Sequence, residues 1–133
     1  MFQRAVMRFP RNGAKKQRFF MAERLNFLTT EGVAQMDRPA PDCLIAGDPV
    51  FSTWNHDDQD GLYCGIWQST PGKWRVIYTE WEYCHIRSGI SVLTTEDGTA
   101  RTLLAGDSFI IPRGFTGTWE VVETTTKDYV IRL

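Results

Sequence analysis

Three side chains in the C-terminal half of the chain have the chemistry of a binding site. Glu82 lies in the run EWEYCHIRSG, Trp119 in GTWEVV and Lys127 in TKDYVI. A carboxylate inside a fold is unfavourable unless a cation pairs with it, and Lys127 or Arg75 is the available partner. Such a pair beside an indole ring would suit a small polar or anionic ligand, with Glu82 as a candidate general acid or base.

Strand alternation predicts which other side chains share this interior. If Glu82 faces inward, Cys84 does too, and His85 faces outward or toward a partner. Lys127 and Tyr129 share one face of the last strand by the same argument. The predicted ligand-binding residues are Arg75, Tyr78, Trp119, Lys127 and Tyr129, and the candidate catalytic residue is Glu82.

Each of these residues also has a purely structural interpretation. Glu82 with a cation makes an ordinary structural ion pair, Trp119 suits a core, and Lys127 can cover apolar surface while reaching solvent. Cys84 is expected to be an inert buried thiol, because no adjacent base activates it. His85 is expected to be a hydrogen-bonded structural or interface histidine.

The cysteines and the second histidine offer no further site. Cys43, Cys64 and Cys84 are odd in number and contain no CxxC pair, so they predict neither a zinc site nor a disulfide framework. A reducing cytoplasm fits this pattern. His56 belongs to the run NHDDQD, which is expected to be a solvated loop rather than a calcium site.

Length and composition predict one globular domain. The chain has 133 residues, of which 42% are hydrophobic and 23% charged, close to the averages for folded proteins. No apolar stretch approaches the roughly 18 residues of a membrane helix. A net charge of −1 gives no general attraction to nucleic acid or acidic membranes.

Charge and composition divide the chain into three segments. Residues 1–22 carry six of the fifteen basic residues and no acidic ones, and they lack the apolar core of a secretory signal. We expect a mobile basic tail, or translated sequence upstream of a true start at Met21. Residues 23–47 are expected to be an arm, with a short helix from Ala22 to about Met36 and then a proline-rich loop. Residues 48–133 form the predicted domain.

Short β-branched and aromatic runs fill this domain, and turn residues interrupt them every eight to twelve positions. About nine strands with no intervening helix predict an antiparallel sandwich or barrel. The runs are VFSTWN (50–55), LYCGIWQ (62–68), KWRVIYT (73–79), EYCHIR (82–87), SVLTTE (91–96), TARTLLA (99–105), DSFIIP (107–112), FTGTWEVVE (115–123) and TKDYVIRL (126–133).

Two of the turn-bounded runs, EYCHIRSG and GDSFIIPRG, resemble the two sequence motifs of the cupin superfamily. More narrowly, residues 48–133 resemble the small single-domain cupins related to the (S)-ureidoglycine aminohydrolase cupin domain. The resemblance implies an all-β fold, the double-stranded β-helix or jelly-roll barrel, here with a short N-terminal extension. It also implies a homodimer, because a small barrel would not bury Trp54, Trp67 and Trp74 together.

The resemblance implies a metal site that this sequence does not provide. Metal-binding cupins place two histidines before the glutamate of the first motif and a third after the second motif. The corresponding positions here are Arg75 and Ile77 (or Val76 and Tyr78) and Gly117, so only Glu82 remains. A catalytic metal needs about three protein ligands, and we therefore predict no metal and no cofactor.

Two classes of function stay open on these grounds, an enzyme and a non-catalytic binding module. We expect a cupin-fold protein that binds a small polar or anionic metabolite in a metal-free barrel pocket. The alternative is a metal-dependent or metal-independent amidohydrolase-type enzyme of ureide nitrogen metabolism. The expected partners are a small-molecule ligand and a second copy of the chain, without nucleic acid or membrane, in the cytoplasm.

Overall fold

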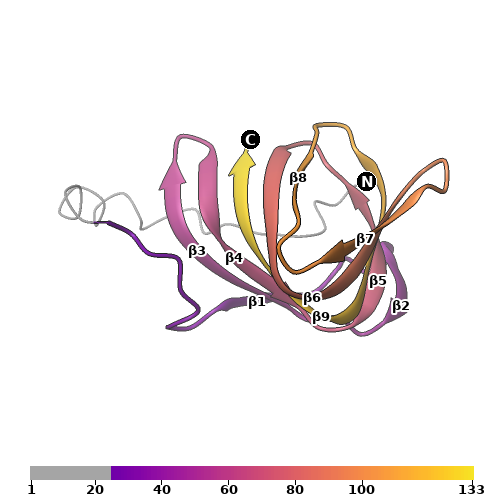
Figure 1. Cartoon of the computed structure of the whole chain (residues 1–133), viewed down its shortest axis with the longest axis horizontal. Helices are drawn as coiled ribbons and strands as arrows, with labels where there is room; N and C mark the ends of the chain where they lie inside the picture. Colours follow the sequence, from indigo (N-terminus) through magenta and orange to yellow (C-terminus); the bar gives the residue numbers. More distant parts are fainter. Residues whose placement is uncertain (1–24) are drawn as a thin grey trace.

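Nine β-strands and no helix run through residues 25–133, the part of the chain described by the computed structural model (Figure 1). All strand pairs are antiparallel, so the predicted all-β jelly-roll barrel is confirmed. The strands are β1 (Gln35–Asp37), β2 (Leu44–Gly47), β3 (Phe51–Gln59), β4 (Leu62–Ser69), β5 (Gly72–Ile77), β6 (Trp81–Thr95), β7 (Ala100–Leu104), β8 (Ser108–Ile111) and β9 (Thr116–Arg132).

Two long strands, β6 and β9, connect the two walls of the barrel. The second half of β9 pairs with β4, and the first half pairs with β5. β6 follows β9 along most of its length and pairs with β8 at one end and β7 at the other. One wall therefore contains β1, β3, β4 and β8, the other contains β2, β5 and β7, and β6 and β9 belong to both.

β6 passes from one wall to the other at Gly89. The register between β6 and β9 shifts repeatedly between Ile86 and Ser91. Gly89 has a φ of +93°, and a Cβ there would lie 2.1 Å from the carbonyl oxygen of Thr124 on β9. Only glycine fits this crossing. The shift also changes which residues face inward, from Glu82, Cys84 and Ile86 before it to Ser91 after it.

Aromatic side chains fill the interior between the two walls. Trp67 of β4, Trp74 of β5 and Trp119 of β9 are each fully buried, and the Trp67 ring lies 6.2 and 5.7 Å from the other two. Phe51 packs against the same group, with ring centroids 4.8 Å from Trp74. These rings fill one part of the core, and the rings of Trp67 and Trp119 also contact the buried Lys127.

The predicted helix from Ala22 to about Met36 is wrong over the residues that the structure describes. Residues 25–34 run as an extended segment, and β1 then pairs with β3. The backbone of this segment is held by sheet side chains, because both the N–H and the carbonyl oxygen of Thr29 contact Nε2 of His56. These tertiary contacts override the weak helical periodicity. The predicted tail, residues 1–22, lies outside the described residues.

The predicted loop at NHDDQD is also wrong, since β3 continues to Gln59. The hairpin turns instead at Asp60 and Gly61, whose φ angles are 48° and 83°, as a type I′ turn requires. The polar residues of this strand still pair with β4, and the register shift between Asn55 and Asp57 places His56 at a bulge.

The burial of the tryptophans removes one argument for a homodimer. Trp67 and Trp74 are fully buried within a single chain, and Trp54 is half-buried, with its Nε1 donating to the carbonyl oxygen of Gly32 over 3.4 Å. The homodimer itself stays a prediction.

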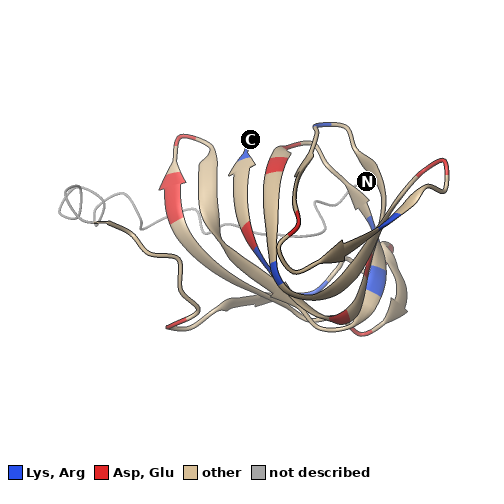
Figure 2. Cartoon of the chain, viewed as in Figure 1, with Lys and Arg blue, Asp and Glu red and all other residues tan. Residues whose placement is uncertain are grey.

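Acidic and basic residues are spread over the strands and turns of both walls (Figure 2). None of the described residues belongs to a helix that could cross a membrane.

Candidate functional site

The predicted pairing of Glu82 with a cation is present inside the barrel, and the cation is Lys127. Nζ of Lys127 lies 2.8 Å from Oε2 of Glu82, and both side chains are 0% exposed. β6 positions the carboxylate and the second half of β9 positions the ammonium, on the inward side of each strand. Burial works against the charged ammonium, but the charge and hydrogen bond of the Glu82 carboxylate outweigh it, so the pKa of Lys127 is raised.

Two indole rings enclose the ammonium on its remaining sides. Nζ lies 4.7 Å from the ring centroid of Trp67 and 4.5 Å from that of Trp119, within the range of cation–π attraction. Nζ also lies 3.7 Å from the sulfur of Cys84. Lys127 therefore extends into the core among aromatic rings, and the interpretation in which its head group reaches solvent does not hold.

Buried hydroxyl groups fix the orientation of Trp119. Its Nε1 donates to Oγ of Ser91 over 3.1 Å, and Ser91 is itself hydrogen-bonded to Thr125 at 2.7 Å. Both hydroxyl residues are fully buried. The indole N–H and both hydroxyl groups therefore have hydrogen-bond partners, and these bonds hold the Trp119 ring rigidly against Lys127.

Two tyrosines complete the polar interior. Tyr78 and Tyr129 are fully buried, and the Tyr129 hydroxyl donates to Oδ1 of Asn55 over 2.7 Å. Burial raises the pKa of Tyr78 well above the usual value, and the negative charge of the nearby Glu82 carboxylate raises it further. Burial likewise raises the pKa of Tyr129.

Four buried polar atoms form no hydrogen bond of normal geometry among the described residues: both carboxylate oxygens of Glu82, the Tyr78 hydroxyl and Nε1 of Trp74. Oε2 of Glu82 still faces the Lys127 ammonium at 2.8 Å, which leaves Oε1 as the oxygen without a charged neighbour at ion-pair distance. Oε1 of Glu82 and the Tyr78 hydroxyl supply an acceptor and a hydroxyl at the ion pair, and Nε1 of Trp74 is a donor within the same core. Unpartnered polar atoms are rare in protein interiors and call for a water molecule or a ligand. These atoms have the donor and acceptor capacity to hold a small polar molecule.

Arg75 is not part of this interior, and its predicted inward orientation is wrong. On β5 the neighbouring residues Trp74 and Val76 are buried, as is Tyr78 just beyond the strand, so alternation places Arg75 on the exposed outer side. Of the predicted ligand-binding residues, the structure brings Tyr78, Trp119, Lys127 and Tyr129 into the same core as Glu82.

Cys84 is buried beside the ion pair but is not activated. Burial and the nearby Glu82 carboxylate raise its pKa well above the usual value for a thiol. The thiolate is the nucleophilic form, so this arrangement suppresses its reactivity. Cys43, Cys64 and Cys84 are all free, as expected from their spacing.

The interior does not fit the metal that the resemblance implies. Val76 pairs with Gly117, and neither residue carries a donor group. Tyr78 would have to bind as phenolate, which its raised pKa opposes. The ammonium of Lys127 already neutralises Glu82, and no group of three His, Cys, Asp or Glu side chains within residues 25–133 could hold a metal ion.

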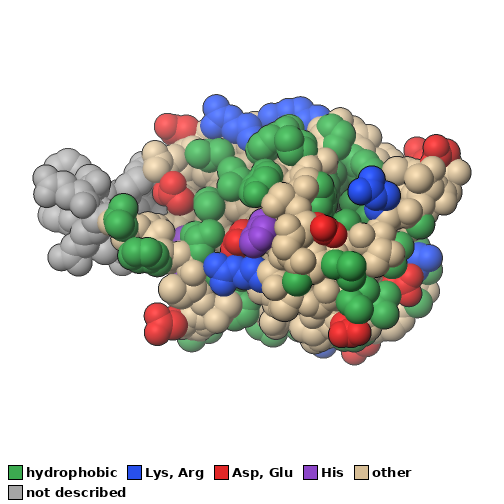
Figure 3. Space-filling view, viewed as in Figure 1, with side chains coloured by type: hydrophobic (Ala, Val, Ile, Leu, Met, Phe, Trp, Pro, Cys, Tyr) green, Lys and Arg blue, Asp and Glu red, His purple; other side chains and the backbone are tan. Residues whose placement is uncertain are grey.

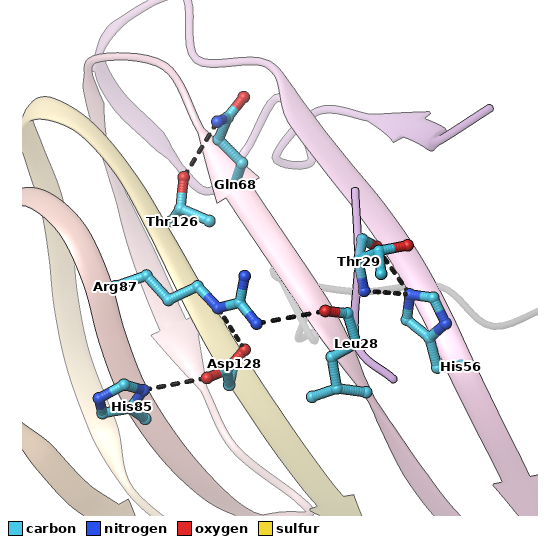
Figure 4. Close-up of polar contacts among 8 residues, drawn as sticks. All are labelled: Leu28, Thr29, His56, Gln68, His85, Arg87, Thr126 and Asp128. Atoms are coloured by element: carbon cyan, nitrogen blue, oxygen red, sulfur yellow. Dashed lines mark hydrogen bonds and ion pairs between the residues drawn. The ribbon is translucent and has the colours of Figure 1, made fainter. Parts of the chain in front are cut away.

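A second polar cluster lies on the outer surface of the wall formed by β4, β9 and β6 (Figure 4). Asp128 accepts from Nε of Arg87 over 2.7 Å, and Nδ1 of His85 lies 3.0 Å from its other oxygen. Arg87 also donates to the carbonyl oxygen of Leu28 over 3.4 Å, which ties the N-terminal segment to the wall. His85 is thus hydrogen-bonded, as expected. Figure 3 shows a histidine at the surface beside acidic and basic side chains.

Sequence reasoning missed three residues of the interior site. The sequence argument places Trp67 only among three tryptophans that a small barrel would not bury together, whereas in the structure Trp67 is buried on the same side of β4 as Gly65 and Ser69. Asn55 reaches Tyr129 across two strands, and nothing in the sequence signals this. Ser91 faces inward only because of the register shift near Gly89, which a regular alternation cannot predict.

Solved structures similar to this chain share its fold. A protein of unknown function from Pseudomonas syringae pv. tomato matches with a TM-score of 0.71 and 23% identity, over 78% of this chain and 46% of that protein. EutQ of Clostridium difficile matches with a TM-score of 0.58 and 17% identity, over 63% of each chain. A putative EutQ of Salmonella typhimurium matches with a TM-score of 0.56 and 16% identity, over 62% of this chain and 68% of that one.

The chain spans about half the length of the Pseudomonas protein and under two thirds of the Clostridium EutQ. No curated protein matches it. Residues 57–129, more than half of the chain, match the family described as the EutQ-like cupin domain. The match includes all of β4 to β8 and most of β9, and with them Glu82, Trp119 and Lys127. The chain belongs to the EutQ-like cupin domain family.

Proposed function

We propose that this protein binds a small polar or anionic metabolite inside the barrel, beside the ion pair of Glu82 and Lys127, without a metal ion. The observation that carries the proposal is the presence of two polar atoms at this pair without a hydrogen bond of normal geometry, namely Oε1 of Glu82 and the Tyr78 hydroxyl. A ligand that accepts one hydrogen bond and donates another would satisfy them. The rings of Trp67 and Trp119 hold the ammonium of Lys127 beside this position.

Catalysis at this site would depend on Glu82. Its Oε2 is held by Lys127, and Oε1 is the oxygen left to exchange a proton with a ligand. Within residues 25–133 no nucleophile activated by a base adjoins it, since the Cys84 thiol is buried with a raised pKa. We therefore place ligand binding first and an amidohydrolase-type reaction on a ureide second.

Ligand entry requires the barrel to open, because both charged side chains are fully buried. We expect slow association and a ligand small enough to replace a few ordered waters. A ligand bound only to the folded chain raises the melting temperature in proportion to its occupancy. Thermal-shift measurement against small carboxylates, amides and their uncharged analogues therefore identifies candidates, and calorimetry then measures their affinities.

The decisive comparison uses two matched tyrosine variants. Tyr78→Phe removes the unpartnered hydroxyl from the interior, whereas Tyr83→Phe removes a hydroxyl that bonds Ser108 on the outer side. We expect Tyr78→Phe to weaken ligand binding by about tenfold, the effect of one lost hydrogen bond of about 1.4 kcal/mol, and Tyr83→Phe to leave it unchanged. Equal affinities for both variants, or no binding by any member of the library, would overturn the proposal.

A further inference from the structure

Lys127 contacts its surroundings as a bound organic ammonium ion would. Its Nζ faces one carboxylate oxygen at 2.8 Å and two indole rings at 4.5 and 4.7 Å, and it is shielded completely from water. A carboxylate and aromatic faces around one cation are the features by which proteins recognise alkylammonium groups. We call the space bounded by Glu82, Trp67 and Trp119 the enclosure. Its two rings offer no lone pairs to a metal ion, so the enclosure does not suit one.

The enclosure does not depend on Lys127 for its shape. Trp119 is fixed by its hydrogen bond to Ser91, and Trp67 packs edge-on against it with ring centroids 5.7 Å apart. Glu82 is held within β6, which pairs with β8 on one side and β9 on the other. None of these supports involves the lysine side chain, so we expect the carboxylate and the two rings to stay arranged around the volume that its removal leaves.

We propose that Glu82, Trp67 and Trp119 form a binding site for a primary alkylammonium group, which Lys127 fills from within the chain. The lysine supplies the positive charge that a metal ion would otherwise bring to the carboxylate of Glu82. The proposal is independent of the metabolite proposed above, because it concerns the cation that is already present. Truncation of Lys127 should turn the enclosure into a site open to a free cation.

The test replaces the missing atoms with a free molecule. Lys127→Ala removes three carbons and the ammonium nitrogen, which are the heavy atoms of n-propylammonium. At about ten times its Kd, n-propylammonium chloride should raise the melting temperature of this variant by about 4 °C, with saturation, and leave the unaltered protein unchanged. The controls are sodium chloride at equal ionic strength and n-propanol, which fills the same volume without charge.

A variant of Glu82 tests whether n-propylammonium stabilises Lys127→Ala by binding at the proposed site. In the double variant Glu82→Gln with Lys127→Ala, n-propylammonium should stabilise no more than n-propanol does. Zinc chloride, used as a metal probe, should not stabilise Lys127→Ala, because one carboxylate is too few ligands. Equal effects of n-propylammonium and n-propanol on the single variant, or saturable zinc binding, would overturn the proposal.

A second pair of variants covers the case in which Lys127→Ala does not fold. Lys127→Met retains an unbranched apolar side chain of similar length and loses the ammonium group. It should unfold at a lower temperature than the double variant Glu82→Gln with Lys127→Met, because the single variant leaves a buried carboxylate without a cation. If the single variant is as stable as the double variant, the carboxylate does not need an ammonium ion and the proposal fails.

Discussion

Ser91 links the backbone irregularity of β6 to the orientation of Trp119. Its hydroxyl accepts from the indole Nε1 and pairs with Thr125 in a fully buried network. Ser91→Ala leaves the indole N–H without a partner, and we expect it to lower the free energy of unfolding by about 1–3 kcal/mol. Urea unfolding measures this loss.

Ser52→Ala is the matched control for this variant. Ser52 also lies on a strand, β3, but its hydroxyl contacts only the sulfur of Met36 in an exposed position. We expect its free energy of unfolding to change by no more than about 0.5 kcal/mol. Similar losses for the two serine variants would show that the buried network does not hold Trp119.

The two buried tyrosines predict how stability depends on alkaline pH. Burial raises the pKa values of Tyr78 and Tyr129, so the folded chain keeps both protons where the unfolded chain begins to lose them. Their contribution is complete below about pH 10, the unfolded value, and decreases as the pH rises further. We expect the free energy of unfolding to fall above about pH 10 by up to about 1.4 kcal/mol per pH unit for each tyrosine.

Urea unfolding at several pH values, with tyrosinate absorbance as a second signal, checks this dependence. Tyr78→Phe should make the alkaline decrease shallower, because one of the two titrating groups is gone. A decrease of the same slope in this variant, or tyrosinate formation by Tyr78 in the folded chain near pH 10, would contradict the assigned burial.

Among the elements, β6 and β9 carry the architecture because each serves both walls. Gly89 permits the crossing, and a Cβ there would lie 2.1 Å from the carbonyl oxygen of Thr124. We expect Gly89→Ala to lower the free energy of unfolding by at least about 3 kcal/mol, from backbone strain and this collision together. Thermal and urea unfolding measure the loss.

Gly98→Ala separates strain from collision. Gly98 has a similar φ of +89°, but no atom lies within 4 Å of a Cβ built there. We expect this variant to lose only the strain contribution, about 1–2 kcal/mol. If both glycine variants lost the same free energy, the close approach of β6 to β9 would have no energetic role.

The same two strands show what the sequence could and could not predict. Turn residues and β-branched runs were sufficient to locate β4, β5, β7 and β8 and to predict a barrel. Alternation correctly placed Glu82, Lys127, Trp119 and Tyr129 inside, because each lies on a regular stretch of strand. Alternation failed for Arg75. The sequence allowed either Arg75 and Ile77 or Val76 and Tyr78 to face inward, and the structure buries Val76 and Tyr78.

Other features depend on contacts between distant residues and have no local signal. The runs 82–87 and 91–96 are one strand, since the register shift at Gly89 bends β6 without ending it. The segment before β1 is extended because His56, twenty-seven residues away, binds the backbone of Thr29. Secondary-structure propensity reflects only residues that are neighbours along the chain. It cannot predict these features, because they depend on contacts between residues far apart in the sequence.

At the scale of the whole molecule, the family match and the interior chemistry point in different directions. Residues 57–129 match a cupin family, and the resemblance implies a metal beside Glu82. The residues around that carboxylate supply an ammonium ion, two indole rings and a tyrosine hydroxyl instead. A shared barrel therefore supports different chemistries, depending on a few inward-facing side chains.

Electron density around Glu82 in crystals of the purified protein tests this account most directly. We expect an ion pair between Oε2 and the Lys127 ammonium, with a water or a small organic molecule bridging Oε1 of Glu82 and the Tyr78 hydroxyl. A spherical feature with anomalous signal, at about 2.0–2.2 Å from the carboxylate, would instead be a bound metal. That result, with Lys127 turned away from Glu82, would contradict the claim that the barrel carries its own cation.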